Sequence, residues 1–476
     1  MNQSSATGTK EPVLDAFIEL SEKLKWEALP EATRAMLKIE LLDYLGGAVA
    51  GRALAGMPKW LQNLIDAGGG NNADVIGGPR TSAQIAALCN GYFGHVLEFD
   101  DTHDKAVLHA GSAAIPAAIA AAGLRGRLSG VEFCEATILG IELTSRLGIG
   151  TQLNLVEGGW IYGTLLGHFG ATLAATRIID NRRSALKNAF GIVYCLACGN
   201  HQSTREGAST KHVQPGFAAS NAIVASLIAS GDLEGIKQPL TGEDGLGRVY
   251  LHGRFDSQLA LEGLGQRFEA DRLSFKPYPT CRFTHSPVSA ALMLRKKLGN
   301  DLARVERFEL IMNAQAHDIV GRALPERLSP PTRMPAQFSA QWSVAAALVH
   351  GELTPRQLVD DVPPTPAVKA VIDRIHCSAD SSLAREIGGC TLRAHGPFGV
   401  CEVFEANAKG HPDNPLSREE LLAKFIANLA IAGVSRDDGL KIANEIFEID
   451  RMPDVLPLIA RVSATAYPQR AARTKP

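Results

Sequence analysis

The hydrophobic residues in the first half of the chain recur at the spacing of α-helices. Glu31–Gly51 carries apolar residues along a stripe broad enough to be largely buried. Ser129 followed by Glu132 has the spacing of a capping box, which predicts the start of a further helix. Alanine-rich helical runs follow at Gly170–Ile179 and Ala218–Ile228, where small side chains let helices pack closely. The first half is therefore predicted to be a stack of helices, with no strand before about residue 273.

The pattern changes to a mixture of strands and helices after that point. Residues 400–407 (VCEVFEAN) alternate apolar and polar side chains, as in a strand with one buried face. The predicted strands are Arg307–Ala314, Ile375–Ser378, Gly389–Ala394 and Val400–Asn407. The predicted helices between them are Ser339–His350 and Pro355–Val359. This middle region is typical of a small α+β domain.

Helices resume towards the carboxyl end. Ser417 and Glu420 form a second capping-box pair, and a last helix is predicted from Ser435 to Ile446. The simplest fold class is mainly α with an α+β lid. Its two parts are a large all-helical domain, residues 1–270 and 410–476, and a smaller inserted α+β domain, residues 271–409. A cleft between two such domains is the expected place for a small ligand.

Composition and charge restrict the partners of the chain. It has 476 residues, of which 45% are hydrophobic and 21% charged, so wholesale disorder is excluded. Lysine and arginine number 48 against 50 for aspartate and glutamate, which gives a net charge of -2. This balance does not support nucleic acid or an anionic membrane as a partner. Attraction for an acidic substrate must therefore be local.

The sequence has neither a targeting segment nor a disulfide pattern. Residues 1–12 lack the apolar core of a signal peptide. The most apolar stretch, Ala113–Leu124, is interrupted by Pro116 and too short to span a bilayer, so we predict a buried helix. Eight cysteines are scattered along the chain, and Cys195 and Cys198 fall in an apolar run, which favours free, buried thiols. The expected compartment is a reducing cytoplasm.

Ionisable residues are crowded into one segment before the most apolar helix. They are His95, Glu98, Asp100, Asp101, His103, Asp104 and His109. Such density beside a buried element costs free energy unless the groups pair or take part in chemistry. Neighbouring carboxylates raise one another's pKa and a nearby His or Lys lowers it, which favours a general acid and base near neutrality. The alternative interpretation is a solvated loop that caps the following helix.

A metal site is a further alternative for this segment. His95, Glu98, Asp101 and His103 can supply ligands, and their carboxylates suit a hard cation. The segment has no HExxH motif and no cysteine pair, so zinc is not supported. We expect a site that uses neither a metal nor an organic cofactor.

Six blocks of sequence are distinctive as an ordered set that covers nearly the whole chain. The blocks are Gly94–His103, Leu108–Ala118, Ser209–Ala219, Phe275–His285, Ala336–Ser339 and Lys409–Ser417. Together they resemble the MmgE/PrpD family of 2-methylcitrate dehydratases, cis-aconitate decarboxylases and related epimerases. The resemblance implies a helical domain with an α+β lid and a homodimer, in agreement with the layout predicted from the hydrophobic pattern.

The resemblance also implies roles for individual residues. It points to Asp101, Thr102, His109, Lys211 and Lys276. In this interpretation Asp101 and His109 move protons and Thr102 positions them. Lys211 and Lys276 hold carboxylate and stabilise the negative charge that forms next to it.

Other residues of the same blocks complete the expected substrate site. Arg282 can bind a carboxylate through two parallel hydrogen bonds, with His285 close by in sequence. Glu98 stands where many members of the family have Asp, and His103 is a further binding candidate. The predicted catalytic residues are thus Asp101, Thr102, His109 and Lys211, and the predicted substrate-binding residues are Glu98, His103, Lys276, Arg282 and His285.

The expected activity is that of a cofactor-independent lyase or isomerase. Proton abstraction next to a carboxylate would eliminate water from a small hydroxy-polycarboxylate such as 2-methylcitrate. Two positions depart from the family's pattern, because Ile161 follows Gly-Trp where many members have His, and Gln214 stands where some members have His. Decarboxylation or epimerisation of a related substrate, a metal-dependent hydrolase and a catalytically silent homologue therefore stay open as alternatives.

Overall fold

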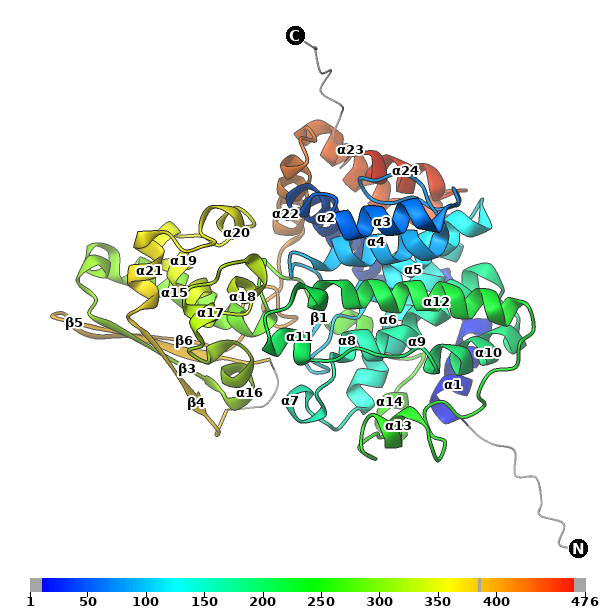
Figure 1. The fold of residues 1–476 in the computed structure, drawn as a ribbon, viewed down its shortest axis with the longest axis horizontal. Coiled ribbons are helices and arrows are strands. Elements are labelled where there is room, and N and C mark those ends of the chain that lie inside the picture. The colour runs from blue at the N-terminus through cyan, green and yellow to red at the C-terminus, as the bar shows by residue number, and fades with distance from the viewer. Residues whose placement is uncertain (1–10, 384–386, 466–476) are drawn as a thin grey trace, which may run out of the picture.

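The structure, a computed structural model, describes residues 11–383 and 387–465. A large helical part and a smaller part with a sheet lie side by side (Figure 1). The long helices of the large part are α1 (Pro12–Lys23), α2 (Glu31–Ala55), α3 (Lys59–Gly68), α4 (Ala83–His95), α5 (Gly111–Arg125), α6 (Gly130–Gly150), α9 (Gly167–Ile179), α10 (Arg183–Tyr194) and α12 (Gln214–Ser230). The predicted fold class, mainly α with a small α+β domain, is confirmed.

Short helical turns connect these elements. In the helical part they are η1 (Trp26–Ala28), α7 (Leu155–Gly158), α8 (Tyr162–Leu165), α11 (Gln202–Arg205), η2 (Ser209–Val213), α13 (Leu246–Val249), α14 (Ser257–Leu261), η3 (Glu269–Arg272) and η7 (Ile449–Arg451). In the smaller part they are η4 (Arg282–Thr284), η5 (Gly299–Arg304), α16 (Ala314–Ala316), η6 (His317–Gly321), α17 (Pro325–Leu328), α18 (Arg333–Gln337), α20 (Gln357–Asp360) and α21 (Pro366–Ile372).

Helices α4, α5, α9 and α12 form the centre of the helical part, and α6 packs against α9. Small residues bring the backbones close together. A Cβ atom at Gly91 would lie 2.6 Å from the Cα of Gly216, and one at Gly170 would lie 2.3 Å from the carbonyl oxygen of Gly140. Side chains there would push the helices apart. The predicted buried helix is confirmed as α5, which continues through Pro116.

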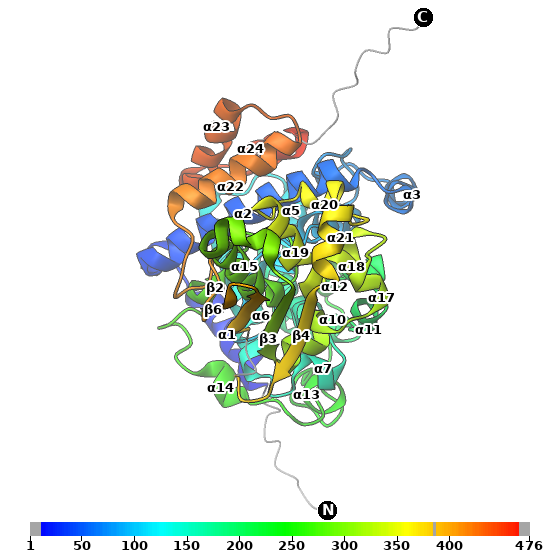
Figure 2. The ribbon, with the colours of Figure 1, turned by 90° about the vertical axis from the view of Figure 1, so that its left-hand side faces the viewer.

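The smaller part is built on a four-stranded sheet in the order β4-β3-β5-β6 (Figure 2). The strands are β3 (Arg307–Asn313), β4 (Ile375–Asp380), β5 (Cys390–Gly396) and β6 (Gly399–Glu405). Strand β3 runs parallel to β4 and antiparallel to β5, which is antiparallel to β6. The smaller part also contains helices α15 (His285–Leu298) and α19 (Ala340–His350), and α15 contacts β5 and β6.

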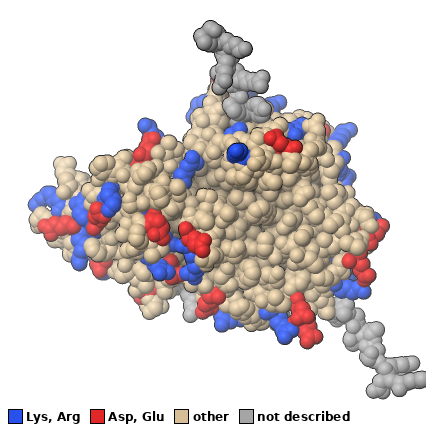
Figure 3. Space-filling model, viewed as in Figure 1, with Lys and Arg blue, Asp and Glu red and all other residues tan. Residues whose placement is uncertain are grey.

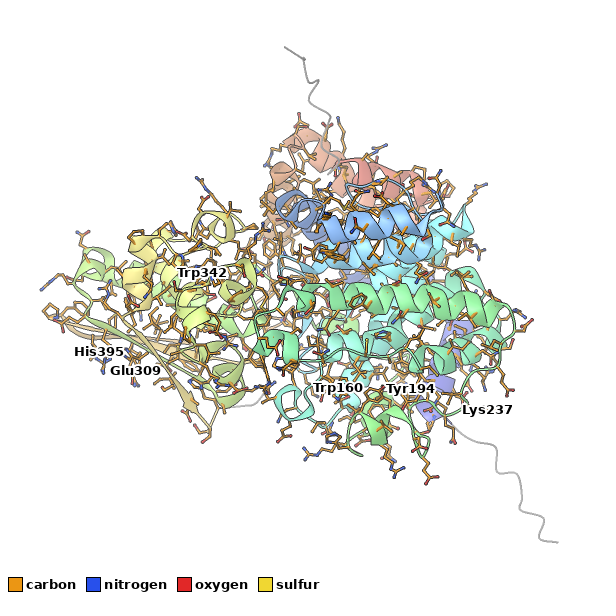
Figure 4. The ribbon with its side chains drawn as sticks, viewed as in Figure 1. Trp160, Tyr194, Lys237, Glu309, Trp342 and His395 are labelled. Carbon is orange, nitrogen blue, oxygen red and sulfur yellow. The ribbon has the colours of Figure 1, made fainter. Side chains whose placement is uncertain are left out.

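The two faces of this sheet differ as the strand pattern predicts. Phe308, Leu310 and Leu392 alternate onto the covered face and are buried. Glu309 on β3 and His395 on β5 lie on the opposite face, away from Trp342 of α19 (Figure 4). All four predicted strands are confirmed within a few residues.

Three C-terminal helices return to the helical part and pack around α2 (Figure 1). They are α22 (Arg418–Ile431), α23 (Arg436–Phe447) and α24 (Leu456–Thr465). Both predicted capping boxes are formed, since Ser129 and Ser417 each accept the amide N–H three residues on and the glutamate there binds back. These bonds fix where α6 and α22 begin.

The chain crosses from the helical part to the smaller part near Phe275 and returns near Gly410, and these two crossing segments are in contact. The amide of Phe275 donates to the carbonyl oxygen of Gly410 (3.0 Å). Strand β2 (Leu273–Ser274) pairs with β1 (Thr102–His103) of the helical part. The predicted limits of the inserted domain, residues 271–409, stay a prediction. The two ends of the predicted helical domain, residues 1–10 and 466–476, lie outside the described residues.

Three local predictions from the sequence differ from the structure. The strand β1 lies before residue 273, and its two residues are too few for a periodic pattern. Cys195 and Cys198 follow the end of α10 at Tyr194 and are exposed, and Cys377 and Cys401 are half-buried, so the prediction of buried thiols is wrong for the first pair and only partly right for the second. The helix predicted at Pro355–Val359 is the single turn α20.

One described segment, Ser209–Ser230, is long and apolar enough for a membrane-crossing helix by length and composition. It comprises η2 and α12. Within its most apolar window 67% is buried inside the structure, as in the core helix of a folded domain.

Candidate active site

The loop between α4 and α5 carries the crowded ionisable residues, and the structure buries nearly all of them. His95, the last residue of α4, is 1% exposed, and so are Glu98, Asp100 and Asp101. The backbone turns sharply here, since Glu98 has a φ of 52°. This left-handed conformation is uncommon for a residue other than glycine. The interpretation as a solvated loop is therefore wrong.

A hydrogen-bonded network joins this loop to η2. Lys211 Nζ donates to Glu98 Oε1 and to His95 Nε2, the latter over 2.7 Å. The other ring nitrogen, His95 Nδ1, donates a hydrogen bond to Asp100 Oδ2 over 2.7 Å. His95 is then a neutral ring that carries its proton on Nδ1, which agrees with the lowering of its pKa by burial and by Lys211.

Lys276, which follows β2, binds the same loop through its backbone and its carboxylates. Its ammonium donates to the carbonyl oxygen of Glu98 (3.0 Å) and lies 3.5 Å from Glu98 Oε2. It also lies 4.0 Å from Asp100 Oδ1. Burial lowers the pKa of both Lys276 and Lys211, although Asp100 partly offsets this for Lys276. Two lysines thus share a water-poor space with two carboxylates.

Asp101 caps the amino end of α5. Its carboxylate accepts hydrogen bonds from the amides of Ala110 (2.8 Å) and Gly111 (3.2 Å). Burial and the neighbouring Asp100 raise the pKa of Asp101 to about 7, while the two amides lower it. Asp101 therefore shapes the loop through its carboxylate and its backbone, and its side chain points at the helix end.

His109 is held at the cavity by that same backbone. Its Nδ1 donates to the carbonyl oxygen of Asp101 (2.6 Å) and lies 3.3 Å from Asp100 Oδ2. This fixes the proton on Nδ1 and leaves Nε2 with its lone pair on the opposite side of the ring. Burial lowers the pKa of His109 to about 3, so the ring is neutral and able to accept a proton.

A cavity opens between this network and the smaller part of the molecule. Its polar wall is formed by Glu98, Thr102, His109, His201, Lys211 and Arg282. Its apolar wall includes Ile161, Phe283, Phe338 and Ile387. Residues from both parts of the chain line it, as expected for a ligand site between two domains.

Arg282 brings a positive charge to the cavity from the smaller part. Its guanidinium binds Asp104 through two nitrogens, with Nε 3.0 Å from Oδ1 and Nη2 2.7 Å from Oδ2. Ser274 also donates to Asp104 (2.7 Å) and holds that carboxylate in place. The third nitrogen, Nη1, is buried and has no hydrogen-bond partner within residues 11–383 and 387–465. It is a donor that a substrate carboxylate can satisfy.

Thr102 lies on the same wall. Its hydroxyl is buried and, among the residues that the structure describes, hydrogen-bonds to none. A buried hydroxyl without a partner is uncommon, so we expect a bound molecule to complete its hydrogen bonding.

Three predicted binding residues do not line the described cavity: Lys276, which binds the loop after α4, and the histidines His103 and His285. His103 Nδ1 accepts the amide of Ala106 (3.2 Å) and its Nε2 lies 3.4 Å from Glu269 Oε2. His285 Nε2 lies 3.2 Å from the carbonyl oxygen of Thr280, and its ring packs against Tyr278. Neither histidine lines the described cavity, so the structure gives both a role in the surrounding framework.

A second layer of buried charges lies behind the loop. Lys424 of α22 pairs with Asp43 of α2 (2.7 Å) and donates to the carbonyl oxygen of Phe99 (3.0 Å). Its ammonium also lies 3.9 Å from the centre of the Phe99 ring. Burial and Asp101 raise the pKa of the neighbouring Glu40 well above its usual value. The C-terminal helices therefore help to hold the loop.

Four residues of this arrangement were not among the predicted site residues: His95, Asp100, His201 and Lys424. The density of ionisable groups marked the first two, since both lie in the crowded segment. Lys424 lies 325 residues from Phe99, and His201 lies in a polar turn, so neither had a local signal.

The closest grouping of potential metal ligands in the described chain is His95, Asp100 and His109, whose donor atoms lie within 4.8 Å of one another. Two of the ring nitrogens are already used, because His95 Nδ1 donates to Asp100 and His109 Nδ1 donates to the carbonyl oxygen of Asp101. The nearby ammonium groups of Lys211 and Lys276 also disfavour a cation. This donor set fits a proton-transfer network better than a metal centre.

These features define a class of protein: a helical enzyme of two domains, with a cavity lined by charged side chains where the two domains meet. The amino-terminal domain model of the MmgE/PrpD family matches residues 16–258, and the carboxyl-terminal domain model matches residues 278–448. The chain belongs to the MmgE/PrpD family.

Curated relatives cover nearly the full length of the chain. A cis-aconitate decarboxylase of Aspergillus terreus is 24% identical over 96% of this chain and 97% of its own. A cis-aconitate decarboxylase-like protein of Aspergillus oryzae is 25% identical over 93% of this chain and 95% of its own. At this identity the relatives indicate the kind of enzyme and leave the substrate of this chain open.

Proposed function

We propose that this chain is a lyase that acts, without a metal or organic cofactor, next to a carboxylate of a small polycarboxylate. The observation that carries the proposal is the polar cavity wall, which combines Lys211, Glu98 and neutral His109 with Arg282, whose buried Nη1 has no partner among the described residues. Cleavage next to a carboxylate requires a group that binds it, a group that moves a proton and positive charge near the developing anion. The wall offers all three.

Elimination of water from a hydroxy-polycarboxylate is the reaction that we assign first. His109 Nε2 takes the proton from the carbon next to a carboxylate, and the C–O bond to the hydroxyl group breaks as the double bond forms. Lys211 stabilises the charge of the intermediate, since burial lowers its pKa and makes its proton easier to share. Arg282 Nη1 and the Thr102 hydroxyl hydrogen-bond a substrate carboxylate.

Decarboxylation is the second candidate, favoured by the names of the relatives from Aspergillus. The same wall supports it, because breakage of the C–C bond releases CO2 and leaves an anion that Lys211 stabilises until a proton is added. Ile161 lines the cavity where many members of the family have His, and the loss of that imidazole bears equally on dehydration and on decarboxylation.

Proton NMR in D2O with EDTA tests the proposal directly. The purified protein is incubated with 2-methylcitrate, citrate, cis-aconitate and an amino-dicarboxylate. We expect one substrate to be consumed or to exchange the hydrogen next to its carboxylate for deuterium. Loss of water and loss of CO2 give different product spectra, and so does inversion at that carbon. No change in any of the four would refute the proposal for this substrate class, and activity that returns only with an added divalent metal would favour a hydrolase.

We also propose that the protein is a homodimer through its helical part. In Figure 3 the broad surface of this part shows very few charged side chains. Phe217, Leu227 and Ile228 of α12 are exposed, and so are Trp60 and Leu64 of α3. An uncharged apolar surface of this kind is typical of an interface. Light scattering on the wild-type protein and on Leu227→Lys is the test, and a wild-type monomer would refute it.

A further inference from the structure

His201 lies on the cavity wall with no assigned task. It precedes α11, in a segment that runs antiparallel to the residues before α8. The amide of His201 donates to the carbonyl oxygen of Gly159 (2.8 Å), and the amide of Ile161 donates to Gly199 (2.8 Å). Trp160, labelled in Figure 4, pairs with Asn200 between these two bonds. His201 and Ile161 are therefore neighbours across a short two-stranded pairing, and both line the cavity.

The ring of His201 is buried, and one of its two nitrogens has no hydrogen-bond partner among the described residues. The side chain belongs to a residue that is 4% exposed, and its Nδ1 has no hydrogen-bond partner in the described part of the chain. Three charged groups face it from separate elements: Arg205 of α11, Asp318 of η6 and Arg327 of α17. Burial, Arg205 and Arg327 lower the pKa of His201 to about 4, while Asp318 raises it. A buried imidazole with an unsatisfied nitrogen costs free energy that a bound ligand recovers.

Gln214 fixes the turn that carries this ring. Its amide nitrogen donates to the carbonyl oxygen of Asn200 (3.0 Å) and to the hydroxyl of Ser203 (2.8 Å). These two residues flank His201 in sequence. The two positions at which the sequence departs from the family pattern, Ile161 and Gln214, therefore both contact the turn of His201.

We propose that His201 is a second proton-transfer residue of this cavity, and that Gln214 is its positioning residue. The inference rests on the proposed lyase function and adds the group that protonates the leaving hydroxyl oxygen. Protonated His201 gives its proton to the hydroxyl group, the C–O bond breaks, and water departs. His109 receives the proton from carbon, so substrate gives alkene and water with no other reactant. Proton exchange with solvent resets both rings.

Substrate binding makes the protonated form of His201 available. The polycarboxylate places negative charge beside the ring, and this raises the pKa of His201 towards the working pH. His201 is therefore expected to be neutral in the empty cavity and charged in the complex. A group that must be protonated gives an alkaline limb in both pH profiles, at the pKa of the empty cavity for kcat/KM and at the higher pKa of the complex for kcat.

The first test compares kcat in His201→Gln, in His201→Gln with Ile161→His, and in the control His376→Gln, whose ring is exposed on β4. We expect His201→Gln to lose roughly 100- to 10,000-fold in kcat together with the alkaline limb of its pH profile. Ile161→His restores an imidazole to the same wall and should recover part of the loss with an alkaline limb. The control should keep the wild-type rate. Unchanged kcat and pH profile in His201→Gln would overturn the inference while leaving the lyase function in place.

The second test does not depend on turnover. NMR of protein labelled with 15N-histidine, with the His201 signal assigned from His201→Gln, is recorded with and without propane-1,2,3-tricarboxylate. We expect the His201 ring to titrate at a higher pH in the complex, by more than one pH unit, while His376 is unchanged. A tricarboxylate that binds and shifts other cavity signals without the His201 titration would overturn the inference alone. Absence of both turnover and tricarboxylate binding would overturn the proposed function as well.

Discussion

Two networks of charged side chains in this molecule have similar contacts and opposite surroundings. In the loop after α4, Lys211 pairs with Glu98 and His95, and every member is almost fully buried. On the open face of the sheet, Arg393 bridges Glu309 (3.3 Å) and Glu402, with side chains about one-third to one-half exposed. Water hydrates and screens the second network.

The difference teaches that burial, more than pairing, makes an ionic network chemically useful. In the loop, removal of water lowers the pKa of Lys211 and of His95 and brings their proton affinities closer to those of the carboxylates. On the sheet, the bridging carboxylates raise the pKa of Arg393 and so reinforce its charge. The buried network can pass protons, whereas the exposed network only joins three strands.

Removal of Lys211 should have the largest effect. Lys211→Met takes the charge away from the developing anion, and we expect kcat to fall by about 100- to 1,000-fold or more. It also leaves Glu98 with Lys276 as its remaining ammonium partner, which should reduce the free energy of unfolding by less than the roughly 3–5 kcal/mol of a fully unpaired buried charge. Urea unfolding and steady-state kinetics measure the two effects. In Lys211→Met with Glu98→Gln the stability should recover and the activity should not; recovery of both would contradict the role given to Lys211.

Lys424 tests whether the second layer supports the first. Lys424→Met removes the pair with Asp43 and the bond to the Phe99 carbonyl oxygen, so we expect a loss of about 3–5 kcal/mol in unfolding free energy. A smaller fall in kcat should follow, because the loop that holds Glu98 loosens. The double variant Asp43→Asn with Lys424→Met isolates the charge effect. If the double variant regains stability but keeps a low kcat, the hydrogen bond from Lys424 to the Phe99 carbonyl oxygen positions the loop. Full activity in both variants would rule out this positioning role.

His168 offers a buried histidine outside the cavity. Its Nδ1 donates to the carbonyl oxygen of Thr164 (2.8 Å), and burial lowers its pKa from 6.5 to about 4. Between these two values the unfolded chain binds a proton that the folded chain does not, so stability is lost as the pH falls from 6.5 to 4. We expect the unfolding free energy of wild type to fall about 3 kcal/mol further than that of His168→Gln over this range. Equal pH dependence of the two would contradict a neutral buried ring.

Arg393 should show the smallest effect. Arg393→Gln breaks both contacts on the open face of the sheet, where water takes over the solvation of Glu309 and Glu402. We expect kcat and the thermal unfolding midpoint to stay at the wild-type values, in low and in high salt. A clear loss of activity in Arg393→Gln would mean that the open face of the sheet communicates with the cavity.

The elements of the fold could be predicted from the sequence because their signals are local. Ser129 with Glu132, and Ser417 with Glu420, each specify a helix start through bonds within four residues. Alternation along β3, β5 and β6 likewise reflects one covered face. Strand β1 was missed because its partner, β2, supplies the reason for it from far along the chain.

The chemistry of the site was only partly predictable. Crowding marked the loop, but the direction of each side chain depends on contacts made elsewhere. Asp101 points at the end of α5, and His103 turns to Glu269, although Thr102 between them faces the cavity. No periodicity exists in an irregular loop, so sequence alone could not separate these neighbours.

The backbone at Glu98 has a consequence for how this protein would evolve. A glutamate held at a φ of 52° keeps its chain in a conformation that glycine adopts freely, at a cost of about 1–3 kcal/mol. Selection for stability alone would favour glycine there once position 211 no longer carries a buried charge, whereas selection for turnover favours the carboxylate that Lys211 binds. Position 98 is thus a point where the two pressures oppose each other. A descendant that had lost its reaction should drift to glycine at this position while the rest of the loop still folds.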